Sequence, residues 1–295
     1  MPARGGGRLP RTRGYPGPAQ PGRRLLPPYG ENPCGGAYCV RYLISDTVQI
    51  WLRSTRLSLR QPAWVISNLA EPVVWLLLFG QMYGSLARLP GFPTASYVEY
   101  FAPGVVTMTA LFGSAWAGLG LITDIQRGTL DKLLATPAHR LALILGRVFH
   151  TGLTVAVQCL IVVATASLMG APTITGLPGA FAVAFIAGLF GIGLSAFSHA
   201  LAVLVPREDP LAALINFVSL PLVFISTAMV PARFLPPWMQ AAVQYNPVNW
   251  AVEAVRTLML DGWVWSVLAR DTALLLLLAA LLNLAAVCAF ATRTR

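Results

Sequence analysis

The sequence predicts an all-α integral membrane protein with six transmembrane helices. Of its 295 residues, 56% are hydrophobic and only 11% are charged, and the mean hydropathy is +0.65. Soluble domains carry roughly 25% charged residues, so most of this surface is expected to face something other than water. Predominantly apolar runs of about 20 residues are long enough to cross a bilayer core of roughly 30 Å. Six such runs cover approximately residues 63–83, 100–122, 143–169, 179–204, 211–230 and 272–291.

The distribution of basic residues predicts the orientation of the chain. The net charge is +10, and the 21 Lys and Arg residues fall unevenly between the two sides of the predicted spans. Residues 1–62 hold ten, residues 123–147 hold four, Arg207 adds one and the C-terminus adds two, which places 17 on one side and four on the other. Cytoplasmic loops carry the excess of Lys and Arg, so both termini are predicted to be cytoplasmic. The basic excess therefore indicates topology and attraction to anionic lipid rather than nucleic-acid binding.

The segment before the first span has two parts. Residues 1–38 are rich in Gly, Pro and Arg and are predicted to be a disordered cytoplasmic tail, so that the membrane domain comprises residues 39–295. In residues 41–60, apolar side chains recur at spacings near three and four with arginines between them, which predicts an amphipathic helix at the membrane interface. A soluble surface helix is the alternative. The apolar positions are Leu43, Ile44, Val48, Trp51, Leu52 and Leu57.

The first span carries a full charge well inside it, Glu71, followed by Pro72. A carboxylate at this depth costs about 3 kcal/mol unless it is paired or faces a polar cavity. Two interpretations stay open: an acid that faces a cavity or gate, and a protonated or hydrogen-bonded residue at a helix or subunit interface.

The other non-helical and small-residue features indicate packing and the outer surface. Pairs of small residues four apart, including Ala184/Gly188 and Ala187/Gly191, allow helices to approach closely in lipid. Residues 231–262 contain several prolines and tryptophans and are predicted to form short or re-entrant helices at the outer leaflet.

Catalytic and metal chemistry is poorly supported. The only lysine, Lys132, follows Asp131 rather than the glycine of a P-loop, and the sequence has no GxSxG or HExxH motif. The four cysteines lack a zinc spacing, so we expect no disulfide and no bound metal or cofactor. The chain is thus predicted not to be an enzyme. A stand-alone proton-coupled transporter that uses Glu71 is the alternative to a transport subunit driven by a partner.

The charged stretch between the second and third spans, DIQRGTLDKLLATPAHR (124–140), has a helical pattern. Leu130, Leu133 and Leu134 share one helical face, Thr129 is a suitable N-cap, and Pro137 ends the helix. A helix of about residues 129–136 is too short to be stable alone in water, so it is expected to dock against another surface. A solvated loop with incidental leucines is the alternative.

Three blocks of the sequence resemble the permeases of type-2 ATP-binding-cassette exporters, in the branch that contains daunorubicin-resistance and nodulation-factor exporters. The first block is EPVVWLLLFGQMYG, residues 71–84. The second runs from residue 101 to 148 and contains PG, RGTL, LL and TP. The third runs from residue 221 to 256 and contains a proline pair, an NP and a final arginine. The family often has Glu where Gln126 stands, so that a role for an acid there would fall to Asp124 or be absent.

The resemblance implies a six-span half-transporter in the plasma membrane that dimerises with itself or a close paralogue. Two separate ATPase subunits would bind ATP and Mg²⁺ and drive export of an amphiphilic or hydrophobic substrate such as a drug, natural product, lipid or glycan. It also implies that residues 129–136 are a coupling helix seated on the ATPase and that residues 41–60 are the interfacial helix. The residues implied in coupling are Arg127, Gly128, Thr129, Leu130, Lys132, Leu133, Leu134, Pro137 and Arg140.

Overall fold

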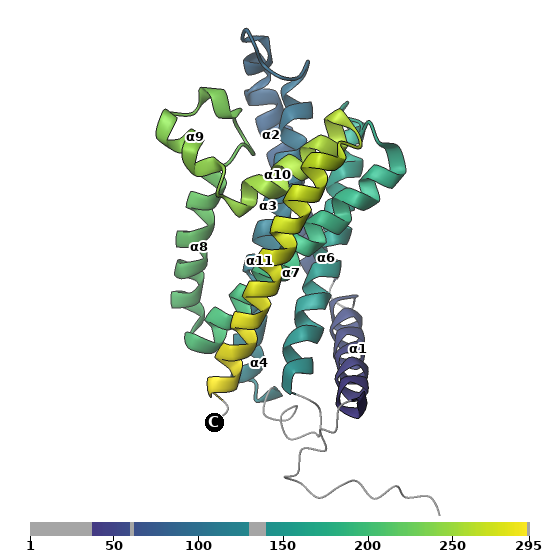
Figure 1. Cartoon of the computed structure of the whole chain (residues 1–295), viewed down its shortest axis with the longest axis vertical. Coiled ribbons are helices and arrows are strands. Elements are labelled where there is room, and N and C mark those ends of the chain that lie inside the picture. The colour runs from purple at the N-terminus through teal and green to yellow at the C-terminus, as the bar shows by residue number, and fades with distance from the viewer. Residues whose placement is uncertain (1–36, 60–61, 130–139, 294–295) are drawn as a thin grey trace, which may run out of the picture. The chain divides into compact units, whose positions relative to one another are not determined.

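The computed structural model describes residues 37–59, 62–129 and 140–293, and this part of the chain is helical without strands (Figure 1). From Val40 onward the chain forms one unit. The longer helices are α1 (Ala37–Leu59), α2 (Pro62–Met82), α3 (Tyr97–Ala115), α4 (Ala117–Gln126), α6 (Arg140–Leu168), α7 (Gly176–Leu204), α8 (Glu208–Phe224), α10 (Pro247–Arg256) and α11 (Trp265–Arg293). The shorter ones are η1 (Gly84–Arg88), η2 (Ala232–Phe234), α9 (Pro237–Val243) and η3 (Thr257–Asp261).

Helix α7 lies at the centre of the bundle, against α3, α4, α6 and α11. Small residues let its neighbours approach: a Cβ added to Gly188 would lie 3.1 Å from the Gly152 carbonyl oxygen of α6, and one added to Gly193 would lie 3.1 Å from the Ala279 Cα of α11. Without a hydrophobic driving force between helices in lipid, such close backbone packing is a main source of helix association. Gly188 and Gly191, the glycines of the two predicted small-residue pairs, therefore lie at contacts with α6.

Four of the described helical segments are long and apolar enough to cross a membrane. They match four of the six predicted runs. They are Tyr97–Gln126, Leu141–Leu168, Gly176–Leu204 and Trp265–Ala289. The first of these combines α3 and α4, which are separated only by Trp116.

The remaining two predicted spans correspond to shorter apolar segments among the described residues. Helix α2 has 21 residues, and Ala70–Met82 is an apolar stretch within it; α8 has 17 residues and ends at Phe224, before the predicted end at residue 230. At 1.5 Å per residue, a helix of the length of α8 spans only about 25 Å. The described residues thus establish a multi-pass helical protein with four full-length candidate spans.

Residues 231–262 fold as four short helices, η2, α9, α10 and η3. Of these, α10 is the most deeply packed, because it contacts α3, α7 and α11 and lies across the upper part of the bundle in Figure 1. Asn246 caps its start by accepting a hydrogen bond from the Val248 N–H at 2.9 Å, and Pro247 takes the first helical position. This segment therefore includes one helix, α10, that is packed into the bundle.

Helix α1 packs on the first turns of α6. A Cβ added to Gly146 would lie 2.8 Å from Ile50 Cγ2, and the His150 ring nitrogens lie 3.2 Å from the Thr55 hydroxyl and 2.9 Å from the Ser58 hydroxyl. The predicted amphipathic helix is therefore a helix in the structure, and it begins at Ala37, earlier than the predicted residue 41.

Candidate functional site

The predicted coupling residues lie between the end of α4 and the start of α6. Helix α4 ends when the Arg127 N–H donates to the Thr123 carbonyl at 3.0 Å, and Gly128 follows with φ +64°. No atom lies within 4 Å of a Cβ added to Gly128, so the left-handed backbone alone favours glycine there. Thr129 is the last described residue before the gap, and Arg140 is the first residue of α6. Leu130, Lys132, Leu133, Leu134 and Pro137 lie outside the described residues, so their predicted roles stay predictions.

An ion pair joins the two helices that flank this segment. Arg147 Nη2 of α6 lies 2.6 Å from Asp124 Oδ2 of α4, and the two side chains are 15% and 32% exposed. The ion pair therefore joins α4 to α6, about one turn before residue 127 and two turns after residue 140. Because Gln126 stands where the family often has Glu, a role for an acid here would fall to Asp124 or be absent, and the structure pairs Asp124 with Arg147. Its partner Arg147 was not predicted, because it is separated by 23 residues and lies within an apolar run.

A second contact, made by Ser198 of α7, lies at the break between α3 and α4. At Trp116 the two helices separate, and Ser198 of α7 bridges the break: its hydroxyl donates to the Ala115 carbonyl and accepts from the Gly118 N–H at 2.9 Å. Gly118 also has no room for a side chain, since an added Cβ would lie 2.6 Å from Ser198 Oγ. The lower part of the second span is thus a separate helix that is connected to α7 at its start and to α6 at its end.

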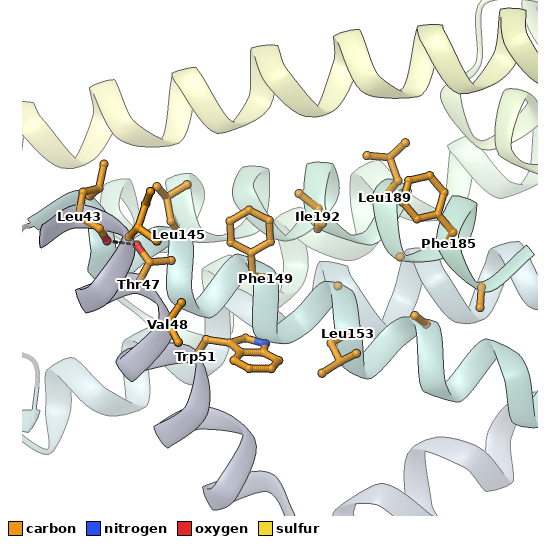
Figure 2. Close-up of a pocket in the computed structure, with 15 residues that line it drawn as sticks. Leu43, Thr47, Val48, Trp51, Leu145, Phe149, Leu153, Phe185, Leu189 and Ile192 are labelled. Atoms are coloured by element: carbon orange, nitrogen blue, oxygen red, sulfur yellow. Dashed lines mark hydrogen bonds between the residues drawn. The ribbon is translucent and has the colours of Figure 1, made fainter. Parts of the chain in front are cut away.

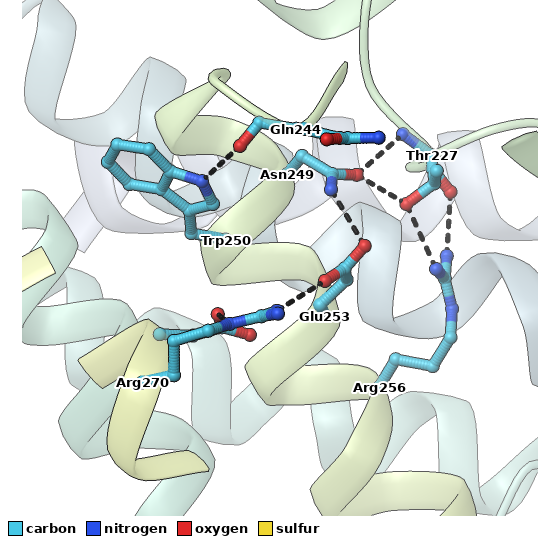
Figure 3. A network of polar contacts seen from close by, with 8 residues as sticks. Thr227, Gln244, Asn249, Trp250, Glu253, Arg256 and Arg270 are labelled. Carbon is cyan, nitrogen blue, oxygen red and sulfur yellow. Dashed lines mark hydrogen bonds and ion pairs between the residues drawn. The ribbon is translucent and has the colours of Figure 1, made fainter. Parts of the chain in front are cut away.

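At the other end of the bundle, a buried polar network holds the chain that follows α8 (Figure 3). Asn249 Oδ1 accepts hydrogen bonds from the Thr227 N–H at 3.1 Å and the Thr227 hydroxyl at 2.6 Å. Arg256 donates to the Thr227 carbonyl at 2.7 Å and lies over the Tyr100 ring at 4.2 Å. Burial lowers the pKa of Arg256 from its ordinary value, and these contacts compensate for the lost hydration. The network connects α3, α10 and the segment after α8.

The asparagine–proline pair of the third sequence block has a structural role in this region. Asn246 Nδ2 donates to the Leu222 carbonyl at 2.7 Å and to the Ile225 carbonyl at 2.6 Å, while its side-chain oxygen caps α10. The Asn246 side-chain amide therefore provides hydrogen-bond partners for two carbonyl groups at the end of α8 and for one N–H group at the start of α10. The contact explains why a polar residue stands at a buried junction.

Two acidic side chains, Glu71 and Asp271, differ in how far they are buried. Glu71 of α2 is exposed and forms no hydrogen bond or ion pair with another described residue. Asp271 of α11 is fully buried, accepts from Arg270 Nε at 2.7 Å, and leaves its Oδ2 without a described partner. Arg270 also contacts Glu253 at 3.2 Å. Asp271 was missed because it lies at the edge of an apolar run, where a charge is expected to be solvated.

No group of three or more His, Cys, Asp and Glu side chains that could hold a metal is present in the described ranges. The polar groups near the flanks of the 127–140 segment and around Thr227 are hydrogen-bonding and ion-pairing groups that position helices.

Comparison with known proteins agrees with this architecture. The family described as ABC-2 type transporter matches residues 46–260. The ycf38 transport permease of Cyanophora paradoxa is 31% identical over 211 residues, which is 70% of this chain and 72% of the relative. The daunorubicin resistance ABC transporter permease protein DrrB1 of Streptomyces coeruleorubidus is 27% identical over 198 residues, 67% of this chain and 69% of the relative. Nodulation protein J of Rhizobium leguminosarum bv. trifolii is 26% identical over 202 residues, 67% of this chain and 74% of the relative.

The matched region includes three of the four described spans, the ion pair that flanks the 127–140 segment and the network around Thr227. It also contains the three blocks on which the sequence resemblance rested. The predicted family is therefore confirmed: the chain belongs to the ABC-2 type transporter family.

Proposed function

We propose that the chain is the membrane-spanning permease subunit of an ATP-driven exporter. Membership of the ABC-2 type transporter family over residues 46–260 is the observation that carries the proposal. Relatives include a drug-resistance permease, and a separate ATPase subunit is expected to supply the energy because the chain has no P-loop lysine. ATP and Mg²⁺ would bind that partner.

The proposed assembly has two permease chains and two ATPase chains in the plasma membrane. In each permease α2 and α8 complete a set of six spans, α1 lies at the interface, and both termini are cytoplasmic. The excess of Lys and Arg on one side supports this orientation. The exposed apolar side chains of α1, among them Ile44, Val48 and Leu57, support its placement against lipid.

The coupling route starts at the segment that joins α4 to α6. ATP-driven closure of the ATPase pair would push residues 129–136, with Leu130, Leu133 and Leu134 in the docked face and Arg127, Lys132 and Arg140 at its rim. The Asp124–Arg147 ion pair would transmit the displacement to the bases of both helices. Because α3 and α4 are separate helices on either side of Trp116, α4 could tilt without an equal tilt of α3. Such coupling requires that ATP binds one of two conformations more favourably.

The substrate is proposed to be amphiphilic or hydrophobic, in keeping with the apolar character of the described spans. Its chemical identity would be tested by the accumulation of lipids or secondary metabolites in cells that lack the gene.

Co-purification with the cognate ATPase tests the coupling face. Leu133→Asp should abolish the association while the permease remains in the membrane, because a carboxylate cannot be buried in an apolar contact without a partner. Leu168→Asp is the matched control: Leu168 is 89% exposed at the far end of α6, so this change should leave the association intact. Co-purification of Leu133→Asp at the wild-type level would contradict the docking face.

The alternative, a proton-coupled transporter that uses Glu71, makes an opposite prediction. Glu71→Gln should abolish transport in that case, whereas it should leave ATP-driven transport active in ours. The exposed position of Glu71 without a described partner is consistent with a contact to lipid or to another chain.

A further inference from the structure

One buried carboxylate oxygen of the bundle has no hydrogen-bond partner. Many hydroxyl groups in the described helices are satisfied within their own helix. Figure 2 shows one beside the apolar groove between α1, α6 and α7, where the Thr47 hydroxyl donates to the Leu43 carbonyl at 2.7 Å. Asp271 of α11 differs: it is fully buried, and among the described residues it is the only acid with an unpartnered buried oxygen, Oδ2. Such an oxygen is costly to leave unpaired, so a donor is expected nearby.

The donor that fits Asp271 Oδ2 lies on the neighbouring residue. The Nε–H and Nη2–H groups of an arginine point in the same direction, and together they match the two oxygens of one carboxylate. Arg270 Nε donates to Asp271 Oδ1 at 2.7 Å, but Arg270 Nη2 donates to Glu253 Oε2 of α10 at 3.2 Å (Figure 3). The second bond of a bidentate Arg270–Asp271 pair is therefore replaced by a bridge to another helix.

Exchange of the Arg270 Nη2 partner leaves no charge without a contact. The bond to Glu253 is long, and the two side chains are 60% and 37% exposed, so water weakens it. A bond to Asp271 Oδ2 would instead involve a carboxylate that is fully buried. Glu253 released from Arg270 would be hydrated, and its Oε1 would still accept from Asn249 Nδ2 at 2.8 Å. Each carboxylate thus keeps one hydrogen bond in either arrangement, and only the Nη2 donor changes its partner.

The bridge to Glu253 connects the last span to the polar network around Thr227. Asn249, which donates to Glu253, also accepts from the Thr227 N–H at 3.1 Å and from the Thr227 hydroxyl at 2.6 Å. A continuous chain of hydrogen bonds therefore runs from Asp271 through Arg270, Glu253 and Asn249 to Thr227. It joins α11 to α10 and to the segment that follows α8. The Arg270–Glu253 bond is its longest and most exposed contact, so the chain opens most readily there.

From these observations we infer that Arg270 is a latch that exchanges partners between α10 and α11. In the latched arrangement, which the structure shows, Nη2 binds Glu253 and holds α10 to α11. In the released arrangement Nη2 binds Asp271 Oδ2, and α10 can move relative to α11 together with the segment after α8. The latch is thus an element with two discrete arrangements. It is built into this chain and does not depend on the proposed ATPase partner or substrate.

Hydrogen–deuterium exchange of the α10 amide groups tests the latch in the purified full-length chain in lipid nanodiscs. Glu253→Gln should raise their exchange about two- to fivefold, the loss expected for a partly exposed ion pair. The single side-chain oxygen of the glutamine remains with Asn249, so that Arg270 Nη2 moves to Asp271.

Asp271→Asn should leave the exchange of the α10 amides at or below the wild-type level. The amide nitrogen that replaces Oδ2 cannot accept a hydrogen bond, so Arg270 stays on Glu253. If Asp271 merely held Arg270 in place, this variant would instead raise the exchange as Glu253→Gln does, and that result would overturn the latch.

Asp261→Asn is the matched control for the loss of one acidic charge close to α10. Asp261 is exposed at the end of η3 and forms no ion pair with a described residue, so its replacement should leave the α10 exchange unchanged. The amides of α6 provide an internal reference for global destabilisation. An effect of Asp261→Asn as large as that of Glu253→Gln would show that net charge, rather than the Arg270 bridge, sets the stability of α10, and would overturn the inference.

Arg270→Lys tests the geometry of the latch without changing a buried residue, since Arg270 is 60% exposed. Lysine keeps the charge, but its one ammonium group cannot occupy the positions of both Nε and Nη2. The exchange of the α10 amides should therefore rise to the level of Glu253→Gln. Exchange at the wild-type level would show that charge alone makes the bridge and would refute the exchange of partners.

Discussion

The Asp124–Arg147 ion pair should stabilise the protein measurably, because it is partly shielded from water. The test is a double-mutant cycle with Asp124→Asn, Arg147→Gln and the two together. In bulk water two unit charges about 4 Å apart attract by ~1 kcal/mol, and near a protein surface by ~4 kcal/mol. Fixing both side chains reduces the net value, and fully exposed pairs contribute about 0.2–1 kcal/mol. With exposures of 15% and 32%, we expect a coupling energy of about 1–2 kcal/mol.

The free energy of unfolding can be measured by equilibrium titration of the purified chain from mild detergent into SDS. Raising the ionic strength from 0.15 M to about 1 M shortens the Debye length from ~8 Å to ~3 Å. The coupling energy should fall only in part, because the 2.6 Å contact is shorter than either length. A coupling energy below about 0.5 kcal/mol, the usual limit of additivity for independent sites, would show that the pair does not hold α4 to α6.

The functional consequence can be separated from stability by exchanging the charges. Asp124→Arg with Arg147→Asp should restore most of the coupling energy and, together with the cognate ATPase, the transport that each single change impairs. If the exchanged pair recovers stability without transport, the ion pair is structural and the coupling route does not pass through it.

Two further changes test the bridge at Trp116 and the network at Thr227. Gly118→Ala should destabilise the chain by about 1–3 kcal/mol in the same titration, because the methyl group would overlap Ser198. Gly120→Ala, which has open space around the added Cβ, should be neutral or slightly stabilising, and equal losses for both would refute the steric argument. Asn249→Ala should cost about 2–3 kcal/mol because it leaves the buried Thr227 N–H without its acceptor. Asn283→Ala, which removes only a bond within α11, should cost less, and a reversed order would contradict the role of the network.

The sequence was most informative where one residue type dominates a long run. Three of the predicted spans agree with the structure to within four residues at each end, and the last begins seven residues earlier than predicted. The agreement follows because about 20 consecutive apolar residues are typical of a membrane-spanning helix. The break inside the second span was not foreseen. Ala115, Trp116 and Gly118 fit a continuous helix by composition, and only the contact with Ser198 of α7 shows why the helix divides there.

The environment of a single charged residue was harder to predict from the sequence than the position of a long apolar run. Glu71 drew attention because of its depth in the first span, yet it is exposed, whereas Asp271 at the edge of the last span is buried. The environment of a lone acid depends on which helix covers it, and that neighbour is distant in sequence. In the same way, Asp124 could be named from the sequence as a candidate acid, but its partner Arg147 could not.

The sequence by itself determined the class of the protein, most of its spans, its amphipathic first helix and its family, because these depend on composition, period and local motifs. The tertiary structure alone decided how those pieces act on one another. It brought Asp124 to Arg147, Ser198 to the break at Trp116, Asn249 to Thr227, and three helices together around an apolar groove. Such contacts join residues tens of positions apart, and their energies depend on distance and burial, which a linear pattern does not contain.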